Sequence, residues 1–137
     1  MKKSPNRMKY KKYFKMPLKY KSNYSEFKQC KKGKIYLYAK ENGRLTSQQL
    51  EAFRKVVSKK LFRKNIMHFI VFPQHPITSK GIGIRMGRGK GKLSHWVILV
   101  NKGDIIFELL YTTYSKCYVA LKYAKKKLPI NTGITGS

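Results

Sequence analysis

Apolar residues recur at helical spacing between residues 46 and 63, which predicts a helix there. Thr46 and Gln49, three residues apart, form a capping-box pattern at its start. Glu51 and Lys55 are spaced for an i, i+4 ion pair on its surface. The apolar positions of this segment are Leu50, Phe53, Val57 and Leu61.

A second segment, 113–127, has the same helical pattern. We expect Thr112 or Thr113 to cap this helix, and Pro129 to end it. The residues after Pro129 predict a short edge strand or a frayed end. The apolar side of the second helix consists of Cys117, Ala120, Leu121, Ala124 and Leu128.

Two other stretches predict β-strands. Residues 65–73 form a β-branched and aromatic run ended by Pro73, which is typical of a largely buried strand. Residues 94–111 read as two strands joined at 101–104, where Asn, Lys, Gly and Asp favour a hairpin turn. Strands therefore mix with helices, which indicates an α+β fold, while the long stretch between Pro73 and Trp96 predicts no regular element.

The charge of the chain narrows the choice of partner. Its 137 residues include 32 Lys and Arg but five acids, so the net charge is +27, and this balance favours a polyanion such as nucleic acid. The length is typical of one domain. The polar face of helix 46–63 is almost wholly basic, which fits either a solvated surface or RNA contact. Its cations are Arg54, Lys55, Lys59, Lys60 and Arg63.

Residues 84–96, "IRMGRGKGKLSHW", alternate glycine with cations. Glycine lets backbone N–H groups approach a phosphate, and Arg and Lys supply charge and donors. The alternative is a flexible surface loop whose charge is incidental. The spacing matches neither the nucleotide P-loop nor G-x-G-x-x-G, so a mononucleotide site is not expected. The candidate RNA-binding residues of this loop are Arg85, Met86, Gly87, Arg88, Gly89, Lys90, Gly91 and Lys92.

Residues 1–40 predict a basic extended arm ahead of a folded domain at 41–137. The arm is either a disordered tail or an RNA-binding segment in which Lys meets phosphate and aromatic rings stack on bases. It lacks the Ser and Ala enrichment of a transit peptide, so we interpret it as mature protein. Its aromatic candidates are Tyr10, Tyr13, Phe14, Tyr20 and Tyr24.

Other classes of function find less support in the sequence. Asp104 and Glu108 would lie about 13 Å apart along one strand, too far to share a metal ion, and His68 falls in an apolar strand, which favours a core position. Cys30 and Cys117 lack partners at metal-ligand spacing. No apolar run is long enough to cross a bilayer. A membrane-surface role for the amphipathic helix remains an alternative.

Four motifs carry a resemblance to a known family. "ENGRLTSQQLEAFRK", "FPQHPITSKGIGIRMGRGKG", "HWVILVNKGDIIFEL" and "AKKKLPI" follow one another from about residue 41 to 130. In this order they resemble the large-subunit ribosomal protein sixteen family of the bacterial and organellar type. The opening "PNRMKYKKYFK" is similar to the basic start of that family, so we add Lys9, Lys11 and Lys12 from it, and Arg44 from the first motif, as candidate RNA-binding residues.

The resemblance implies a single α+β domain, with a twisted, mainly antiparallel sheet and two helices, that docks on large-subunit rRNA. It further implies a place beside aminoacyl-tRNA near the peptidyl transferase centre, with other large-subunit proteins as neighbours. It implies no enzyme activity, no cofactor or metal, no membrane insertion and no homo-oligomer.

Some positions depart from the family pattern. Arg88 stands where lysine is common, and "EFKQCKKGKIYLYAKE" replaces a glycine-rich segment, so contacts of that region do not carry over. Ser94 and His95 stand where an acid and an aromatic residue are usual. The Lys-, Tyr- and Asn-rich, Ala-poor composition is typical of an AT-rich genome. It suggests an organelle-encoded protein, mitochondrial in the first place and plastid in the second.

Overall fold

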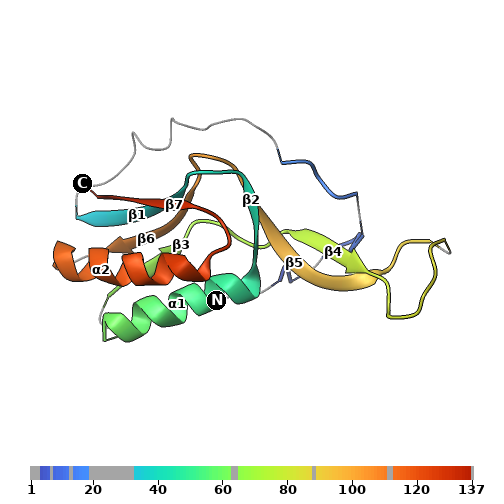
Figure 1. Ribbon diagram of the computed structural model, residues 1–137, viewed down its shortest axis with the longest axis horizontal. Helices are drawn as coiled ribbons and strands as arrows, with labels where there is room; N and C mark the ends of the chain where they lie inside the picture. The colour runs from blue at the N-terminus through green and yellow to red at the C-terminus, as the bar shows by residue number, and fades with distance from the viewer. Residues whose placement is uncertain are drawn as a thin grey trace.

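A computed structural model describes residues 4–6, 8–12, 14–18, 33–62, 65–87, 89–110 and 113–136. Figure 1 shows an elongated molecule in which two helices lie along one sheet, and a second sheet extends away from this body. The elements in chain order are β1 (Lys34–Ala39), β2 (Gly43–Thr46), α1 (Ser47–Lys60), β3 (Met67–Phe69), β4 (His75–Ser79), β5 (Lys92–Val100), β6 (Ile105–Leu110), α2 (Tyr114–Ala124), the 3₁₀ turn η2 (Lys125–Lys127) and β7 (Thr132–Gly136).

The strands form two antiparallel sheets. The body sheet has the order β3-β6-β1-β7, and the extended sheet has the order β2-β5-β4. The long strand β5 pairs with β2 along its second half and with β4 along its first half, so it leads out of the body. The predicted α+β class, with two helices and antiparallel strands, is confirmed.

Helix α1 begins as its capping residues predict. The Gln49 amide donates to Thr46 Oγ1 at 3.3 Å, and the Thr46 amide donates to Gln49 Oε1 at 2.9 Å. These two bonds satisfy N–H groups that have no partner within the helix. The expected pair between Glu51 and Lys55 is not the one that forms, because the Glu51 carboxylate accepts from Arg54 instead, at 2.7 and 3.1 Å. This bond lowers the pKa of the Glu51 carboxyl.

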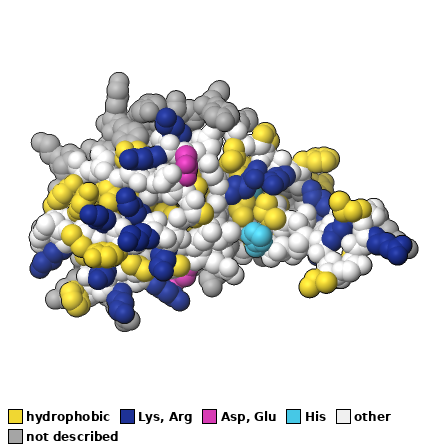
Figure 2. All heavy atoms as spheres, viewed as in Figure 1, with side chains coloured by type: hydrophobic (Ala, Val, Ile, Leu, Met, Phe, Trp, Pro, Cys, Tyr) yellow, Lys and Arg dark blue, Asp and Glu magenta, His cyan; other side chains and the backbone are white. Residues whose placement is uncertain are grey.

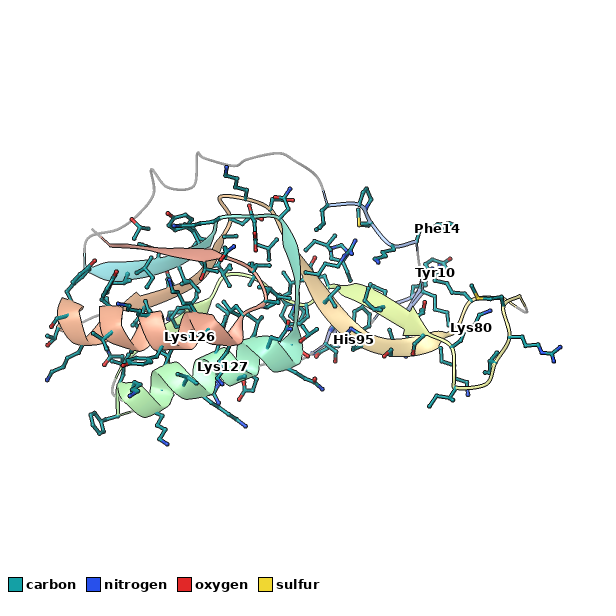
Figure 3. All side chains as sticks on the ribbon, viewed as in Figure 1. Tyr10, Phe14, Lys80, His95, Lys126 and Lys127 are labelled. Atoms are coloured by element: carbon teal, nitrogen blue, oxygen red, sulfur yellow. The ribbon has the colours of Figure 1, made fainter. Side chains whose placement is uncertain are left out.

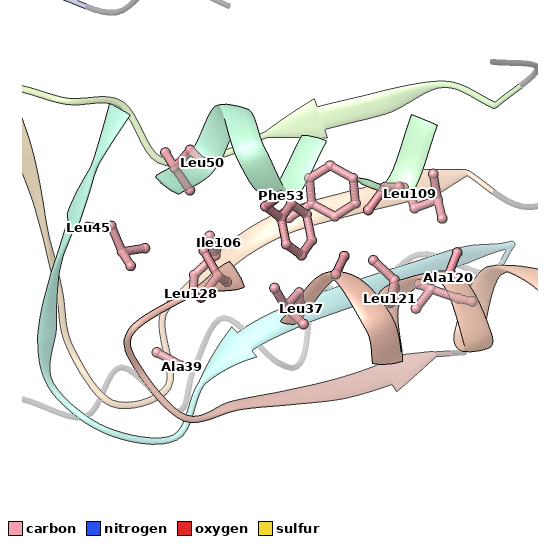
Figure 4. Close-up of a cluster of buried hydrophobic side chains, with 14 of the residues drawn as sticks. Leu37, Ala39, Leu45, Leu50, Phe53, Ile106, Leu109, Ala120, Leu121 and Leu128 are labelled. Carbon is pink, nitrogen blue, oxygen red and sulfur yellow. The ribbon is translucent and has the colours of Figure 1, made fainter. Parts of the chain in front are cut away.

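The core lies between the two helices and the body sheet (Figure 4). The Phe53 ring of α1 meets the Phe107 ring of β6 edge to face, with centroids 5.0 Å apart, and Phe69 lies 5.1 Å from Phe107. Edge-to-face contacts of this kind add to the stabilisation from burial. The predicted apolar positions of both helices are buried, so the helical patterns identified the core faces correctly.

Strand β1 lies within residues 1–40, where the sequence pattern predicted only an extended arm. Ile35, Leu37 and Ala39 are fully buried, because β1 is an inner strand with β6 on one side and β7 on the other. Tyr36, on the opposite face of the strand, is also buried, with 4% of its surface exposed. Strand β1 therefore buries side chains on both faces and lacks the alternation of apolar and polar residues. The missing alternation explains why the segment was not recognised.

The predicted hairpin at 101–104 is wrong, although the turn itself exists. Strands β5 and β6 on either side of it belong to different sheets. The Gly103 amide donates to Ala39 O at 2.8 Å, and the Ala39 amide donates to Asp104 O at 2.9 Å. The turn is therefore a corner bound to the end of β1, and Gly103 provides the positive φ of 94° that the corner requires.

The predicted buried strand at 65–73 is reduced to the three residues of β3 at the edge of the body sheet. Met67 and Phe69 pack against the core, whereas His68 between them is exposed, so the expected core position of His68 is wrong. Alternate residues of a strand face opposite sides, and one side of this edge strand faces solvent.

The stretch between Pro73 and Trp96 contains β4 and the first half of β5, where no regular element was predicted.

At the start of α2, the side chain of Thr113, one of the two expected caps, makes no capping hydrogen bond. The other expected cap, Thr112, lies outside the described residues. The ending at Pro129 is confirmed, since η2 closes just before it, and β7 is the edge strand predicted for the C-terminal residues.

Within the described ranges, no helix has the length and apolar character needed to cross a membrane. The same residues contain no group of three or more His, Cys, Asp or Glu side chains that could hold a metal ion. Asp104 and Glu108 have structural roles instead. Asp104 Oδ2 accepts from the Asn101 amide at 2.8 Å, and Glu108 pairs with Lys34 at 3.1 Å.

Candidate nucleic-acid interface

Strands β4 and β5 carry a loop, residues 80–91, at the end of the molecule farthest from α2 (Figure 1). The exposed fraction of Met86 is 94%, and Ile82 is also fully exposed. Two contacts within the loop close it: Lys80 Nζ donates to Gly87 O, and the Ile84 amide donates to Gly81 O at 3.3 Å. Figure 3 shows Lys80 where the loop leaves strand β4. The loop thus presents cations and apolar side chains beyond the sheet.

Glycine serves two purposes in this loop. Gly87 and Gly89 have φ values of 98° and 79°, in the left-handed region that other residues adopt at a cost. A Cβ on Gly91 would lie 2.3 Å from Ser79 O, because the two ends of the loop approach closely there. The glycines therefore shape the loop itself, a reason that the sequence analysis did not consider.

The N-terminal segment, residues 4–18 as far as they are described, packs along the extended sheet. Lys90 Nζ lies 5.2 Å from the centre of the Phe14 ring, and Lys12 Nζ donates to Lys90 O at 3.5 Å. Arg44 on β2 donates to Met16 O at 3.1 Å. Figure 3 shows Tyr10 and Phe14 beside strands β4 and β5. The structure thus brings the arm and the loop together into one surface.

A groove of about 490 Å³ runs between this segment and β5. Pro5 and Met8 face Leu93 and Trp96 across it, and Lys9 and Lys11 also line it. Sequence reasoning missed Leu93 and Trp96 as supports of the arm. They are three positions apart on β5, and the pairing of β5 with β4 is irregular between them, so the regular alternation of a strand gives no signal that they share a face.

The candidate RNA-binding residues predicted from the sequence lie in three parts of the structure. Arg85, Met86, Gly87, Gly89 and Lys90 are exposed on the loop, Gly91 is half-buried, and Lys92 is exposed at the start of β5; Arg88 lies outside the described residues. Lys9, Lys11 and Lys12 are exposed on the N-terminal segment. Arg44 is half-buried in β2, and one guanidinium nitrogen is used to hold the backbone of Met16. Lys80 is a cation of this surface that the prediction omitted.

The segments that form this surface contain cationic residues and no acidic ones. The sequence has no acidic residue in 1–25 or in 52–103, which together include the N-terminal segment, β4, the loop and all of β5. Cations without neighbouring carboxylates repel one another, and a polyanion relieves that repulsion. Tyr10 and Phe14 keep 69% and 91% of their surface exposed, so their rings remain available for stacking, and Lys9 lies 5.5 Å from the Tyr10 ring centre.

Two titratable groups are affected by burial. The partly buried position of His75 at the start of β4 lowers the pKa of its imidazole. Burial raises the pKa of the Cys117 thiol, which accepts a hydrogen bond from Asn65 Nδ2 at 3.3 Å. Cys117 is a free buried cysteine, as expected for an idle thiol, and Cys30 lies outside the described residues. A raised thiol pKa disfavours the reactive thiolate.

The basic face of α1 forms a separate cationic surface on the body. Lys55, Lys59 and Lys60 are exposed, while Arg54 is partly neutralised by Glu51. Arg63 lies outside the described residues. Figure 2 shows Lys and Arg side chains spread over the helices as well as over the far end of the extended sheet.

Comparison with known proteins identifies the family of the chain. The model of the family described as ribosomal protein L16p/L10e matches residues 5–135. The large ribosomal subunit protein uL16 of Buchnera aphidicola subsp. Cinara cedri is 41% identical over 100 residues, which are 73% of this chain and 74% of that protein. The protein of the same name from Kosmotoga olearia is 47% identical over 90 residues, 66% of this chain and 64% of that protein. The chain belongs to the ribosomal protein L16p/L10e family.

Proposed function

We propose that this chain is a structural, RNA-binding component of the large ribosomal subunit and has no catalytic activity of its own. One observation carries the proposal: the loop at 80–91 and the N-terminal segment form a single cationic surface with no acidic residue in either segment. Backbone phosphates are the natural partner for such a surface. The relatives described above are named as large ribosomal subunit proteins, in line with this role.

The partner of this surface is large-subunit rRNA. Arg85, Arg88 and Lys90 from the loop and Lys92 at the start of β5 bind phosphates, together with Lys9, Lys11 and Lys12 from the arm. The glycines at 87, 89 and 91 keep the loop narrow, so that the RNA backbone reaches it closely. Met86 and Ile82, being almost fully exposed, provide apolar contacts with bases or sugars at the tip.

The loop also helps to shape the site of aminoacyl-tRNA. The support is the resemblance of residues 84–96 to the family's loop, combined with the projection of this loop away from the body. A narrow cationic extension can reach between RNA elements that the wider body cannot enter. Neighbouring large-subunit proteins contact the body of the molecule.

We assign the chain to an organellar ribosome, mitochondrial first and plastid second. The support is its Lys- and Tyr-rich, Ala-poor composition. The relatives described above are bacterial, and they therefore do not distinguish these two compartments from a bacterial origin. Fractionation of source cells, with detection of the native chain in purified mitochondria, tests the assignment; recovery of the chain only outside organelles would contradict it.

The loop is tested by the double variant Arg85→Ala with Arg88→Ala in ribosomes. We expect a folded protein, because Arg85 is exposed on the loop and Arg88 stands between two glycines of the same cationic stretch, but reduced incorporation into large subunits or slower accommodation of aminoacyl-tRNA. Sucrose-gradient sedimentation and single-turnover accommodation kinetics provide the measurements. Lys40→Ala with Lys102→Ala, which removes the same charge from the body, is the matched control.

Normal subunit levels and normal accommodation in the Arg85 and Arg88 double variant would show that the loop has no such role. The broader proposal has its own test, since the native chain must sediment with the large subunit and leave it after ribonuclease treatment. A native chain that sediments free of ribosomes would reject the structural role itself.

A further inference from the structure

The outward surface of α2 combines lysines with exposed aromatic rings. We call it the α2 surface and define it by Lys116, Tyr118, Val119, Lys122, Tyr123 and Lys126. Figure 1 shows α2 at the opposite end of the molecule from the loop at 80–91, and Figure 3 places Lys126 at the end of this helix. The loop and the α2 surface therefore cannot bind the same short stretch of a partner.

The apolar side chains on this surface are only partly covered by the protein. Tyr118 is 41% exposed, Val119 48% and Tyr123 51%. The opposite face of the same helix packs in the core, where Cys117, Ala120, Leu121 and Ala124 are buried. The outward rings therefore contribute little to the core, and a helix needs no tyrosines on its solvent side for stability.

The tyrosines are held in place by neighbours. The Tyr118 ring lies parallel to that of Tyr114, with centroids 6.1 Å apart and an interplanar angle of 19°. Lys60 of α1 lies 4.8 Å from the centre of the Tyr123 ring. Tyr118 and Lys122 are four residues apart on α2, and Lys126 follows four residues later in η2, so one ring is followed by two cations in this direction. Figure 2 shows hydrophobic side chains intermixed with Lys and Arg over the helices.

The charge of this region has no internal counterpart. Glu108 is the last acidic residue of the chain, so α2, η2 and β7 contain none. On α1, the carboxylate of Glu51 is already bonded to Arg54. The ion pairs of the described residues do not involve the lysines of the α2 surface, so the charge of this surface is complementary to a polyanion.

A groove opens where α2 meets the end of α1. It has a volume of about 600 Å³, and Phe62, Val119 and Ala120 provide apolar lining while Lys60 and Lys116 provide charge. Phe62 is 83% exposed at the rim of this groove. A flat apolar group that carries a phosphate, such as an unstacked nucleotide, matches these two properties.

We propose that the α2 surface is a second RNA-binding site, which holds an unpaired rRNA segment by stacking its bases on Tyr118 and Tyr123. Lys116, Lys122 and Lys126 neutralise the phosphates on either side. Splayed bases of single-stranded RNA stack on aromatic side chains irrespective of sequence, whereas a regular duplex hides its base faces. An acidic protein segment would satisfy the lysines but has no flat groups that stack on the exposed rings of Tyr118 and Tyr123. This inference rests on the proposed function.

The test uses the full chain with Arg85→Gln, Lys90→Gln and Lys92→Gln, so that the loop contributes less to binding. Fluorescence anisotropy measures its affinity for an oligouridylate of about twelve nucleotides, within the usual site size of such proteins. An abasic oligoribonucleotide of equal length has the same charge without bases. We expect Tyr118→Leu with Tyr123→Leu to weaken uridylate binding about tenfold and to leave abasic binding almost unchanged.

Matched variants separate stacking from charge and from folding. Tyr118→Phe with Tyr123→Phe keeps both rings and should retain the parent affinity for uridylate. Lys122→Gln with Lys126→Gln should weaken binding of both oligonucleotides to a similar extent. Circular dichroism of each variant should match that of the parent, since these side chains lie outside the core.

The inference is overturned if the Leu variant keeps the parent's preference for uridylate over the abasic strand. Equal affinity for polyglutamate and uridylate, with the same loss in the Lys variant, would point to an acidic protein partner and would also overturn it. Both outcomes leave the proposed function intact as long as the native chain sediments with the large subunit. Loss of that sedimentation rejects the proposed function independently of these titrations.

Discussion

At the level of single residues, Phe62 has an unusual backbone conformation. It follows Leu61, the C-cap of α1, and its φ of 50° lies in the left-handed region. Glycine is the usual residue at this position after a helix, because a Cβ there is close to the backbone. The exposed Phe62 side chain provides little burial to offset this cost.

We therefore expect Phe62→Gly to stabilise the protein by about 1 kcal/mol, since glycine adopts this φ without steric cost. Urea unfolding of the full chain, followed by circular dichroism at a helical wavelength, provides the measurement. Phe62→Ala is the control, because it removes the ring but keeps the Cβ. Equal stability of the Gly and Ala variants would show that the backbone conformation costs nothing.

The imidazole of His75 links stability to pH. Burial lowers its pKa below the ordinary 6.5, so near that pH the unfolded chain binds more protons than the folded one. The free energy of unfolding must then fall as the pH drops from about 7 through 6 and into the range of the lowered pKa. The stabilisation that depends on a neutral His75 is fully present only above this window.

His75→Gln should flatten the stability profile between about pH 7 and pH 5.5, because no proton is then taken up at this position on unfolding. Denaturant midpoints measured at half-unit pH steps test this. His95→Gln, at an exposed position of β5, is the matched control. A profile that keeps its full slope in the His75 variant would exclude this group as the cause.

At the level of elements, the extended sheet and the N-terminal segment depend on each other. Among the described residues the sheet consists of β2, β5 and β4, and one of its faces borders the groove that residues 4–11 line with Leu93 and Trp96. The arm gains an anchor in return, because Arg44 donates to the carbonyl of Met16. Arg44 is thus a structural link as well as a candidate RNA contact.

Arg44→Met should loosen the N-terminal segment, because the bond to Met16 is lost while the aliphatic part of the side chain is kept. Trp96 is the only tryptophan of the chain and lies under this segment. Its emission should shift to the red, and its quenching by acrylamide should increase. Arg54→Met on α1 removes the same charge elsewhere and should leave Trp96 emission unchanged. Identical emission in both variants would contradict the anchoring role.

At the level of the whole molecule, charge governs binding. A net charge of +27 spread over both ends and the helices implies that many counterions leave the RNA when the protein binds. The dependence of affinity on salt therefore measures the extent of the surface in contact. It also separates electrostatic binding from apolar docking, which responds weakly to salt.

If about ten phosphates are neutralised, the slope of log affinity against log salt should be near −9 for structured rRNA fragments. Arg85→Gln with Lys90→Gln and Lys92→Gln should reduce its magnitude by about 2.7, since each lost phosphate contact accounts for about 0.9. Filter binding at several salt concentrations gives both slopes. Affinity that hardly changes with salt would rule out a mainly electrostatic interface.

Local sequence determined the parts of this protein that depend on neighbours in the chain. Thr46 and Gln49 predicted the start of α1, and the apolar spacing predicted which faces of α1 and α2 are buried. Capping bonds and helical periodicity involve residues within about four positions, so they can be read from a short window. The cationic stretch at 84–96 was recognised for a similar reason, since its composition is local, although the bounds of the loop at 80–91 came from the structure.

Tertiary structure alone decided how the strands are shared between sheets. Residues 101–104 have the chemistry of a turn, but only the hydrogen bonds to Ala39 make it a corner between β5 and β6. The buried position of β1, the exposed ring of His68 and the packing of Phe14 against Lys90 likewise depend on partners far along the chain. Strand pairing and burial are properties of contacts between distant segments, and no local pattern contains that information.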